Sequence, residues 1–485
     1  MLKIFKKHYR LLLILLFATL LRFKNIELLT TFSGDQGFDF LKIKEILEGN
    51  LTLLGPKIGP YNQLGNLYLG PAYYYLLAPF LLIFRFDPIG PAYLTALLAV
   101  ATVFLMYCYV LENISKKAAI ISALFYSLDP FLIDQSRAAS NPHLIPFFSI
   151  LSLFSYSKSI SNKKNIWPII CGISLGIIFQ LHYLGFVLIL IYLFHSLHIK
   201  NIKNAFTIIV SVIASISGQI FFEITHKYFI TNLFIKQFLS GETTNSLSGV
   251  INRILESIIS IFRISFGDTT IGVVLIFLFG FLIVVTKPKI TRIHYWLLIL
   301  PIVSTLLFVS LYSGPVQTHY FSIIYPQLFI ILGFIVSLCF ASKNQHLKAI
   351  GIIFCLIFIT SSLANLNLAR MEGYTMPSGW SLIGQKKSVE LIKADEDSSS
   401  DFNVASVLDG DTRAMPIRYL LSTSGRHPLG VEAYPSSKTI YLISRDNKDT
   451  ILKYSVWEVS SFSPFNVINL GEIQNGIFLY KLKKT

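Results

Sequence analysis

Two acidic residues stand close together in a polar segment near the start of the chain, SGDQGFD at residues 33–39. Carboxylates are among the side chains that can do chemistry, so Asp35 and Asp39 are candidate functional residues. The structural alternative is a helix cap, formed by Asp35 or Gly34, because both residue types occur at helix N-termini. An amphipathic helix is expected directly afterwards, at residues 40–49.

A second polar segment, DQSRAASNPH, occupies residues 134–143 between two long apolar stretches. An arginine in such a setting can form paired hydrogen bonds to a phosphate group. Arg137, with Asn141 close to it in the sequence, is therefore a candidate for substrate binding. The alternative for Arg137 is an anchor whose charged end reaches the membrane surface.

Two histidines, His182 in QLHY and His319 in THYF, lie where apolar stretches end. Either histidine alone is more often an ordinary residue of a membrane interface. Ionisable groups are costly at membrane depth, however, and here polar groups from four segments are expected on one face. His182, His319 and Tyr320 therefore join the candidate substrate-binding residues.

The composition indicates what kind of structure positions these residues. Of 485 residues, 53% are hydrophobic and 14% are charged, with a net charge of +15. A soluble chain has too little interior for so much apolar surface. A nucleic-acid-binding protein would gather its basic residues in a patch, whereas here they stand in short runs between apolar stretches. We therefore expect an α-helical polytopic membrane protein in contact with membrane lipids, with no nucleic-acid partner.

The apolar stretches predict about eleven transmembrane helices. The first follows four basic residues and lacks a cleavage site, so it is expected to remain as an uncleaved helix with a cytoplasmic N-terminus. The expected spans lie near residues 11–21, 89–111, 118–133, 143–157, 166–181, 184–198, 205–225, 271–286, 293–312, 320–341 and 347–366.

Basic residues predict the orientation of these helices, because they recur in alternate loops that should be cytoplasmic. The run 72–84, AYYYLLAPFLLIF, is short for a span. It is expected to lie in the interface, with its three tyrosines at the membrane surface, inside a large outer loop at residues 30–88. The loops in question hold Lys116, Lys117, Lys158, Lys163, Lys164, Lys200, Lys203, Lys287, Lys289, Arg292, Lys343 and Lys348.

A change of pattern near residue 370 predicts two domains, at residues 1–370 and 371–485. The second should be a small α+β extracytoplasmic domain with a helix at 381–393. Its Asp409-Gly410-Asp411 triplet is interpreted as a turn rather than a metal site. Its strands are expected at 402–408, 439–444, 451–459 and 476–482.

Four segments together resemble the polytopic glycosyltransferases of the GT-C fold, in the bacterial branch related to protein O-mannosyltransferases and aminoarabinose transferases. The resemblance covers roughly residues 1–370. Two departures stand out: Ser140-Asn141 where many relatives carry a second carboxylate, and Leu69-Gly70 where they often have a lysine. The segments are GDQGFDFLKIKEILEGNLTLLGP (34–56), LGPAYYYLLAPF (69–80), DPFLIDQSRAASNPHLIPFF (129–148) and QTHYFSIIYP (317–326).

The resemblance implies that Asp35 occupies the place of an essential acidic residue, which acts as general base or helps to hold a divalent metal. Such enzymes take a sugar from a polyprenyl-phosphate donor, so the leaving group is a lipid phosphate that a cation must stabilise. Arg137 is the first candidate for that cation and His319 the second.

The expected function is therefore an inverting membrane glycosyltransferase. It would move a sugar from polyprenyl phosphate to a lipid, glycan or protein acceptor on the outer face of the cytoplasmic membrane. The alternative is a polytopic transporter or flippase of a lipid-linked saccharide. A transporter would favour polar or broken helices at the bilayer midplane, whereas the polar residues here cluster toward one face.

Overall fold

A computed structural model of the chain describes residues 2–58, 67–162, 164–240, 247–266, 269–288, 291–312, 316–366, 369–399, 401–408 and 411–485. Lys163 and Lys289 of the predicted cytoplasmic loops, and Asp409 and Gly410 of the predicted turn, lie outside these residues.

The first part of the chain is helical, apart from a two-residue antiparallel pairing of β1 (Lys57–Ile58) with β2 (Leu67–Tyr68). Its helices are α1 (Leu2–Phe23), α2 (Ile26–Leu29), α3 (Gly34–Leu47), α4 (Ala72–Ile83), α5 (Ile89–Asn113), α6 (Lys116–Leu128), α7 (Pro130–Gln135), η1 (Asn141–Leu144), α8 (Ile145–Ser161), α9 (Ile166–Leu181), η2 (Tyr183–Gly185), α10 (Phe186–His198), α11 (Ile202–Ser215), α12 (Ser217–Thr225), α13 (Phe229–Ser240), α14 (Leu247–Phe266), α15 (Thr269–Thr286), α16 (Arg292–His294), η3 (Tyr295–Ile299), α17 (Leu300–Leu311), η4 (Thr318–Ile323), α18 (Tyr325–Ala341) and α19 (Gln345–Asn365).

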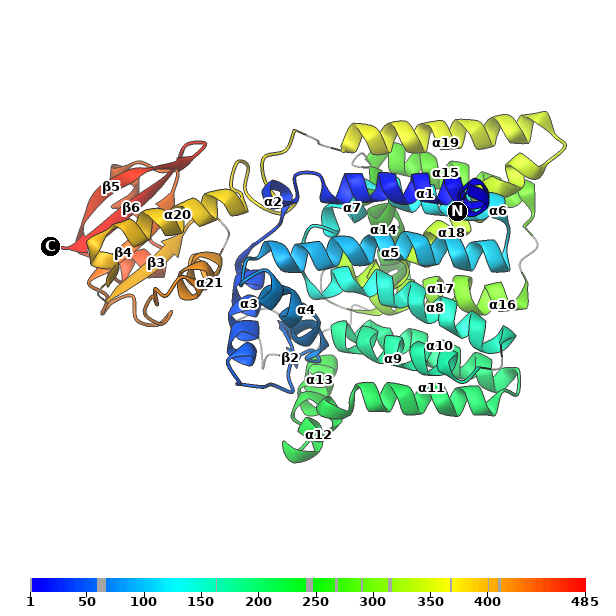
Figure 1. Ribbon diagram of the computed structural model, residues 1–485, viewed down its shortest axis with the longest axis horizontal. Helices are drawn as coiled ribbons and strands as arrows, with labels where there is room; N and C mark the ends of the chain where they lie inside the picture. The colour runs from blue at the N-terminus through cyan, green and yellow to red at the C-terminus, as the bar shows by residue number, and fades with distance from the viewer. Residues whose placement is uncertain are drawn as a thin grey trace.

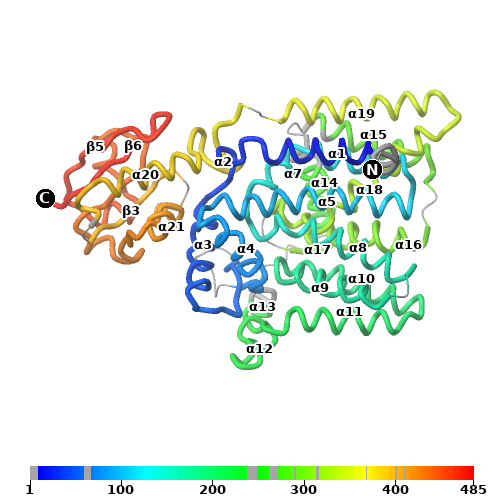
Figure 2. The backbone as a smooth tube through the Cα atoms, viewed as in Figure 1, coloured from blue at the N-terminus to red at the C-terminus, as the bar shows by residue number. Residues whose placement is uncertain are grey.

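Most long helices run side by side in a bundle, whereas α3 lies across one end of it (Figure 1, Figure 2). Helix α4 lies at the same end, next to α3, and packs on α3 and α5. The sheet-containing part of the chain, residues 382–485, adjoins this end. The N-terminus and α16 lie toward the opposite end (Figure 1). The segments expected in the large outer loop therefore share one end of the bundle.

Among the described residues, four helices are long and apolar enough to cross a membrane, or five if α11 and α12, bent by 60°, count as one. The count of about eleven spans therefore stays a prediction.

Three stretches differ from the predicted helices. The expected span at 118–133 is broken at Pro130, where Asp129 caps α7 by accepting a hydrogen bond from the Leu132 amide at 2.9 Å. The expected span at 205–225 is divided between α11 and α12. Helix α14 was not predicted, because polar residues interrupt its apolar positions and leave no continuous apolar run. In the structure it packs on α15 and α17.

The C-terminal part, residues 382–485, has a four-stranded sheet in the order β3-β4-β6-β5, in which only β3 and β4 are parallel. The helix predicted at 381–393 is confirmed as α20. The strand predicted at 451–459 is wrong, because Ile451 and Val459 enter the core from two short helices instead. The elements are α20 (Leu382–Ala394), η5 (Glu396–Ser399), β3 (Phe402–Ser406), α21 (Met415–Thr423), β4 (Thr439–Ser444), α22 (Lys448–Ile451), α23 (Trp457–Ser460), β5 (Phe465–Gln474) and β6 (Ile477–Lys484).

The sheet separates two apolar cores, as the alternation of side chains along a strand requires. On β4, Ile440 and Leu442 face a core of the C-terminal part alone. Tyr441 and Ile443 face the other way, into a core that continues through α20 and α21 into the helical bundle. The C-terminal part is therefore packed onto the end of the bundle where α3 lies.

Candidate active site

Helix α3 begins at Gly34, earlier than predicted, so Asp35 lies in its first turn and Asp39 one turn later. Ser33 and Gln36 form a capping box, in which the backbone amide of Ser33 donates to Gln36 Oε1 at 3.0 Å. Neither Asp35 nor Gly34 is the N-cap residue. The side chain of Asp35 is exposed to solvent.

The surroundings of Asp35 favour a carboxylate that binds protons more tightly than usual. Partial desolvation by the surrounding protein raises the pKa of Asp35. The negative charge of Asp411 raises this pKa further, while the positive charge of Arg413 lowers it. A raised pKa brings a carboxylate closer to the value that suits a general base near neutral pH.

Asp39, one turn further along α3, is buried, unlike the exposed Asp35. Its Oδ1 accepts a hydrogen bond of 3.0 Å from the hydroxyl of Tyr74 on α4. Burial raises the pKa of Asp39 to about 8, against the effect of the Tyr74 hydrogen bond, and Asp35 adds to the rise. Near neutral pH Asp39 is therefore mainly protonated. The two carboxyl groups lie in different surroundings, because Asp39 is buried and Asp35 is exposed.

The tyrosines of the AYYYLLAPF segment explain how α3 is supported. Tyr73 and Tyr74 are buried, contrary to their expected place at the membrane surface, whereas Tyr75 is exposed. The Tyr73 hydroxyl donates to the carbonyl of Ala139 at 2.7 Å. The first two tyrosines therefore connect α4 to the second polar segment and to Asp39.

The second polar segment lies directly against the start of α3. Gln36 Nε2 donates to the Ser140 hydroxyl at 2.6 Å, and Thr31 forms a bridge with Ala138. The amide of Asn141 is turned the other way and donates to the carbonyl of Leu181, at the end of α9, at 2.9 Å. Asn141 thus links the surroundings of α3 to the neighbourhood of His182.

His182, His319 and Tyr320 are brought together as predicted, with rings 5.8 Å apart for the two histidines and 5.4 Å apart for His182 and Tyr320. Burial lowers the pKa of His182 to about 3 and that of His319 to about 4. Both imidazoles are therefore neutral near pH 7. They can donate hydrogen bonds to a ligand but bring no positive charge.

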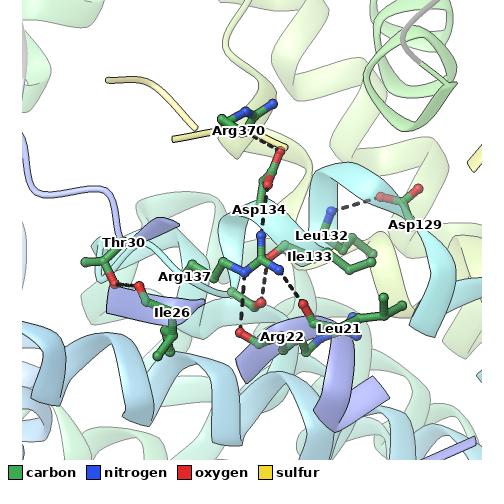
Figure 3. Close-up of polar contacts among 11 residues, drawn as sticks. Leu21, Arg22, Ile26, Thr30, Asp129, Leu132, Ile133, Asp134, Arg137 and Arg370 are labelled. Carbon is green, nitrogen blue, oxygen red and sulfur yellow. Dashed lines mark hydrogen bonds and ion pairs between the residues drawn. The ribbon is translucent and has the colours of Figure 1, made fainter. Parts of the chain in front are cut away.

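Arg137 is placed differently from the expected phosphate ligand (Figure 3). Its guanidinium is buried and donates to the backbone carbonyls of Leu21 and Arg22, the last at 3.3 Å. Asp134 lies 3.6 Å from Arg137 and also pairs with Arg370 at 3.0 Å. Positive charge at a helix C-terminus is favourable, so Arg137 holds the end of α1. This geometry favours an anchoring role for Arg137, through protein contacts rather than the membrane surface.

Arg22, on α1, makes the same kind of contact with the end of another helix, α6. Its fully buried guanidinium donates to the carbonyls of Tyr126 and Ser127, at the end of α6, at 3.2 and 3.1 Å. The two buried arginines thus satisfy carbonyl groups that the ends of α1 and α6 leave without helical partners.

A metal ion would need more ligands than the described residues bring together: no group of three or more His, Cys, Asp or Glu side chains in this part of the chain is arranged to hold one. Asp35 has Asp411 as its acidic neighbour, and Arg413 pairs with that neighbour. In the part of the chain that the structure describes, the surroundings of Asp35 therefore show no such group of ligands.

Comparisons with known proteins identify the fold in which these residues lie. The family model described as dolichyl-phosphate-mannose-protein mannosyltransferase matches residues 69–219. ArnT from Cupriavidus metallidurans, in a structure bound to undecaprenyl phosphate, is similar with a TM-score of 0.65, 11% identity and 98% of each chain covered. The chain has the GT-C fold.

A second GT-C structure shares this fold over less of its length. It is the oligosaccharyltransferase AglB from Archaeoglobus fulgidus, in complex with an inhibitory peptide and a dolichol-phosphate, with a TM-score of 0.52 and 13% identity. The similarity covers 90% of this chain and 70% of AglB. A search of curated protein sequences gives no match. The predicted resemblance is therefore confirmed at the level of the fold.

Some residues of the candidate site were not found from the sequence. Ser33 and Gln36 have the spacing of a capping box, which was the available signal for the true helix start. Tyr74 gave no such signal, because a run of three tyrosines does not reveal which ring points inward. Asp411 and Arg413 are almost 400 residues from Asp35 along the chain, and only the fold brings them near it.

Proposed function

We propose that the chain is an inverting glycosyltransferase. It would move a sugar from a polyprenyl-phosphate donor to a lipid, glycan or protein acceptor on the outer face of the cytoplasmic membrane. In this proposal residues 1–370 are the transferase domain and residues 371–485 an extracytoplasmic domain. The observation that carries the proposal is the exposed carboxylate of Asp35, which stands in the first turn of α3 without being its cap.

The proposed reaction is a single displacement. Asp35 takes the proton from an acceptor hydroxyl as the oxygen attacks C1 of the sugar. The bond between C1 and the phosphate oxygen breaks, and its electron pair leaves with the polyprenyl phosphate. Attack from the side opposite the leaving group inverts the configuration at C1.

Asp39 supports this step through its own protonation. Because it is mainly neutral near pH 7, Asp39 adds little negative charge beneath Asp35, so Asp35 can be ionised. The hydrogen bond from Tyr74 fixes the orientation of the Asp39 carboxyl group.

The donor is proposed to bind beside His182, His319 and Tyr320. Their rings form a cluster, and neutral imidazole and phenol groups can donate hydrogen bonds to phosphate or sugar oxygens. Asn141 connects this cluster to the segment that contacts α3. The undecaprenyl phosphate bound to ArnT and the dolichol-phosphate in the AglB complex support the choice of donor class.

The test is a transfer assay in membranes that contain the full chain. Polyprenyl-phosphate sugars labelled in the sugar are supplied singly, and lipid, glycan and protein fractions are examined for the label. The proposal expects transfer with the wild-type chain and none above background with Asp35→Asn. Movement of the label across the membrane with the sugar still on its lipid phosphate would contradict it and favour a flippase.

A further inference from the structure

The C-terminal part of the chain packs directly against the helix that carries Asp35. Helix α21 packs against α3, and at Gly37 an added Cβ would lie 2.4 Å from the backbone nitrogen of Pro416. One turn earlier, an added Cβ at Gly34 would lie 2.9 Å from Asp411 Oδ2. The side chain of Asp411 thus lies directly over the helical turn that carries Asp35.

Asp411 is one half of a well-formed ion pair. Arg413 Nε lies 2.7 Å from Asp411 Oδ1, and Arg413 Nη2 lies 3.0 Å from Asp411 Oδ2. This fork geometry orients both side chains. The buried side chain of Arg418 donates to the backbone carbonyl of Arg413 at 2.7 Å, which also fixes the main chain at this point.

Contacts between the C-terminal part and the residues around α3 fix the position of this ion pair relative to α3. The ring of Tyr419 on α21 packs edge-on against Phe32 and Phe40, with centroids 5.8 and 5.6 Å away. The Tyr419 hydroxyl donates to the carbonyl of Phe86 at 2.6 Å, and Gln385 on α20 donates to the carbonyl of Phe32 at 2.8 Å. These contacts join α20 and α21 to Phe32, Phe40 and Phe86, so the fold sets the place of the ion pair relative to α3.

We propose that Asp411 and Arg413 are positioning residues of the transferase site, through which the C-terminal part controls the charge of Asp35. This inference rests on the proposed function, in which Asp35 is the base. The two groups act in opposite senses, because the carboxylate of Asp411 disfavours ionisation of Asp35 and the guanidinium of Arg413 favours it. Among the described residues, Asp39 on α3 and Tyr73 on α4 also interact electrostatically with Asp35.

The opposite signs make the proposal testable without knowledge of the substrate. Dicyclohexylcarbodiimide reacts with protonated carboxyl groups, and tandem mass spectrometry separates labelling at Asp35 from labelling at Asp39. In the full-length chain, Asp411→Asn should move half-maximal labelling of Asp35 to lower pH, because a neighbouring negative charge is removed. Arg413→Gln should move it to higher pH, because Asp411 is left uncompensated.

A matched control comes from an exposed ion pair elsewhere in the C-terminal part, between Asp401 and Lys438 at 3.4 Å. Asp401→Asn and Lys438→Gln change the same charges and should leave the labelling curve of Asp35 in place. A general loosening of the fold would move the curves of all variants the same way. Shifts of opposite sign for Asp411→Asn and Arg413→Gln alone would therefore support the proposal.

The transfer assay completes the test with the lipid-linked sugar that the wild-type chain uses. The acidic limb of the pH–rate profile should follow the labelling curve in both variants. Labelling curves that do not move, or that move in one direction, would overturn the positioning role and leave the proposed function intact. Labelling curves that move while the pH–rate profile stays in place would instead show that Asp35 is not the base.

Discussion

Two polar segments meet at the same end of the bundle, and they use their charged residues in different ways. In the second polar segment, residues 134–143, Asp134 pairs with Arg370 and Arg137 holds the carbonyl end of α1, and just before the segment Asp129 caps α7 (Figure 3). At the start of α3 the cap is uncharged, because Ser33 and Gln36 provide it.

This difference gives a criterion for interpreting charged residues near a membrane surface. Every helix end leaves backbone groups without helical partners, and a nearby side chain often satisfies them. Where a charged residue satisfies the helix end, its charge is already engaged in structure. Where neutral residues do so, as at Ser33 and Gln36, a neighbouring carboxylate such as Asp35 is not engaged in the cap.

The largest expected effect that follows from the comparison is on catalysis. Asp35→Asn should reduce transfer by roughly 100-fold or more, since that is the scale of acid–base catalysis, while expression and thermal stability stay close to wild type. Asp35→Ala should behave in the same way, because Ser33 keeps the cap. Loss of stability in Asp35→Ala, with full transfer by Asp35→Asn, would return Asp35 to a structural role.

Arg137 should show the reverse pattern, with an effect on stability rather than on chemistry. Arg137→Ala leaves the carbonyls of Leu21 and Arg22 without their donors, which should lower the free energy of unfolding by about 2–3 kcal/mol. Thermal unfolding in detergent measures this loss. Arg137→Lys should restore it only in part, because a lysine lacks the planar fork.

The control for this prediction is Arg370→Ala. Arg370 pairs with the same Asp134 but is more exposed, so its loss should have a smaller effect on stability. A normally stable Arg137→Ala protein with weak use of the lipid donor would contradict the anchoring role and support a phosphate-binding role.

Within α3, the buried Asp39 should affect the pH dependence of stability, whereas the exposed Asp35 should affect catalysis. Its pKa of about 8 is above that of an aspartate in the unfolded chain, so between about pH 4 and pH 8 the folded state binds more protons. Stability should therefore fall as pH rises through this range, and Asp39→Asn should flatten the dependence of the melting temperature on pH. Transfer should fall less than in Asp35→Asn, since an asparagine oxygen still accepts the Tyr74 hydrogen bond. An unchanged pH dependence would argue against a buried, protonated Asp39.

Much of the helical part could be predicted from the sequence, because apolar runs of spanning length carry a direct signal. Helix α14 was missed because it mixes polar and apolar positions. In the C-terminal part, Ile451 and Val459 belong to the core as their type indicates, but their segment is helical. Burial is more predictable than element type in short segments, since apolar side chains are buried in either conformation.

The candidate site was predictable where its residues are local in sequence. Asp35 and Asp39 share one short segment, and His182 and His319 were expected on one face, where the structure brings their rings together. The inward orientation of Arg137 could not be predicted, because it depends on where the end of α1 lies in space. The docking of Asp411 over Gly34 likewise depends on how the C-terminal part packs against α3.

The smallest expected effect concerns the cap that leaves Asp35 free. Ser33→Ala removes the side chain of the N-cap residue of α3, which typically destabilises a protein by about 1 kcal/mol. Transfer per folded molecule should remain near wild type, because Gln36 still bonds the backbone at position 33 and Asp35 keeps its exposure. Ser115→Ala is a matched control, since Ser115 caps α6 by accepting from the Ala118 amide at 3.2 Å. If Ser33→Ala lost transfer while Ser115→Ala did not, Asp35 would have been drawn into capping, and the two functions would compete at the start of α3.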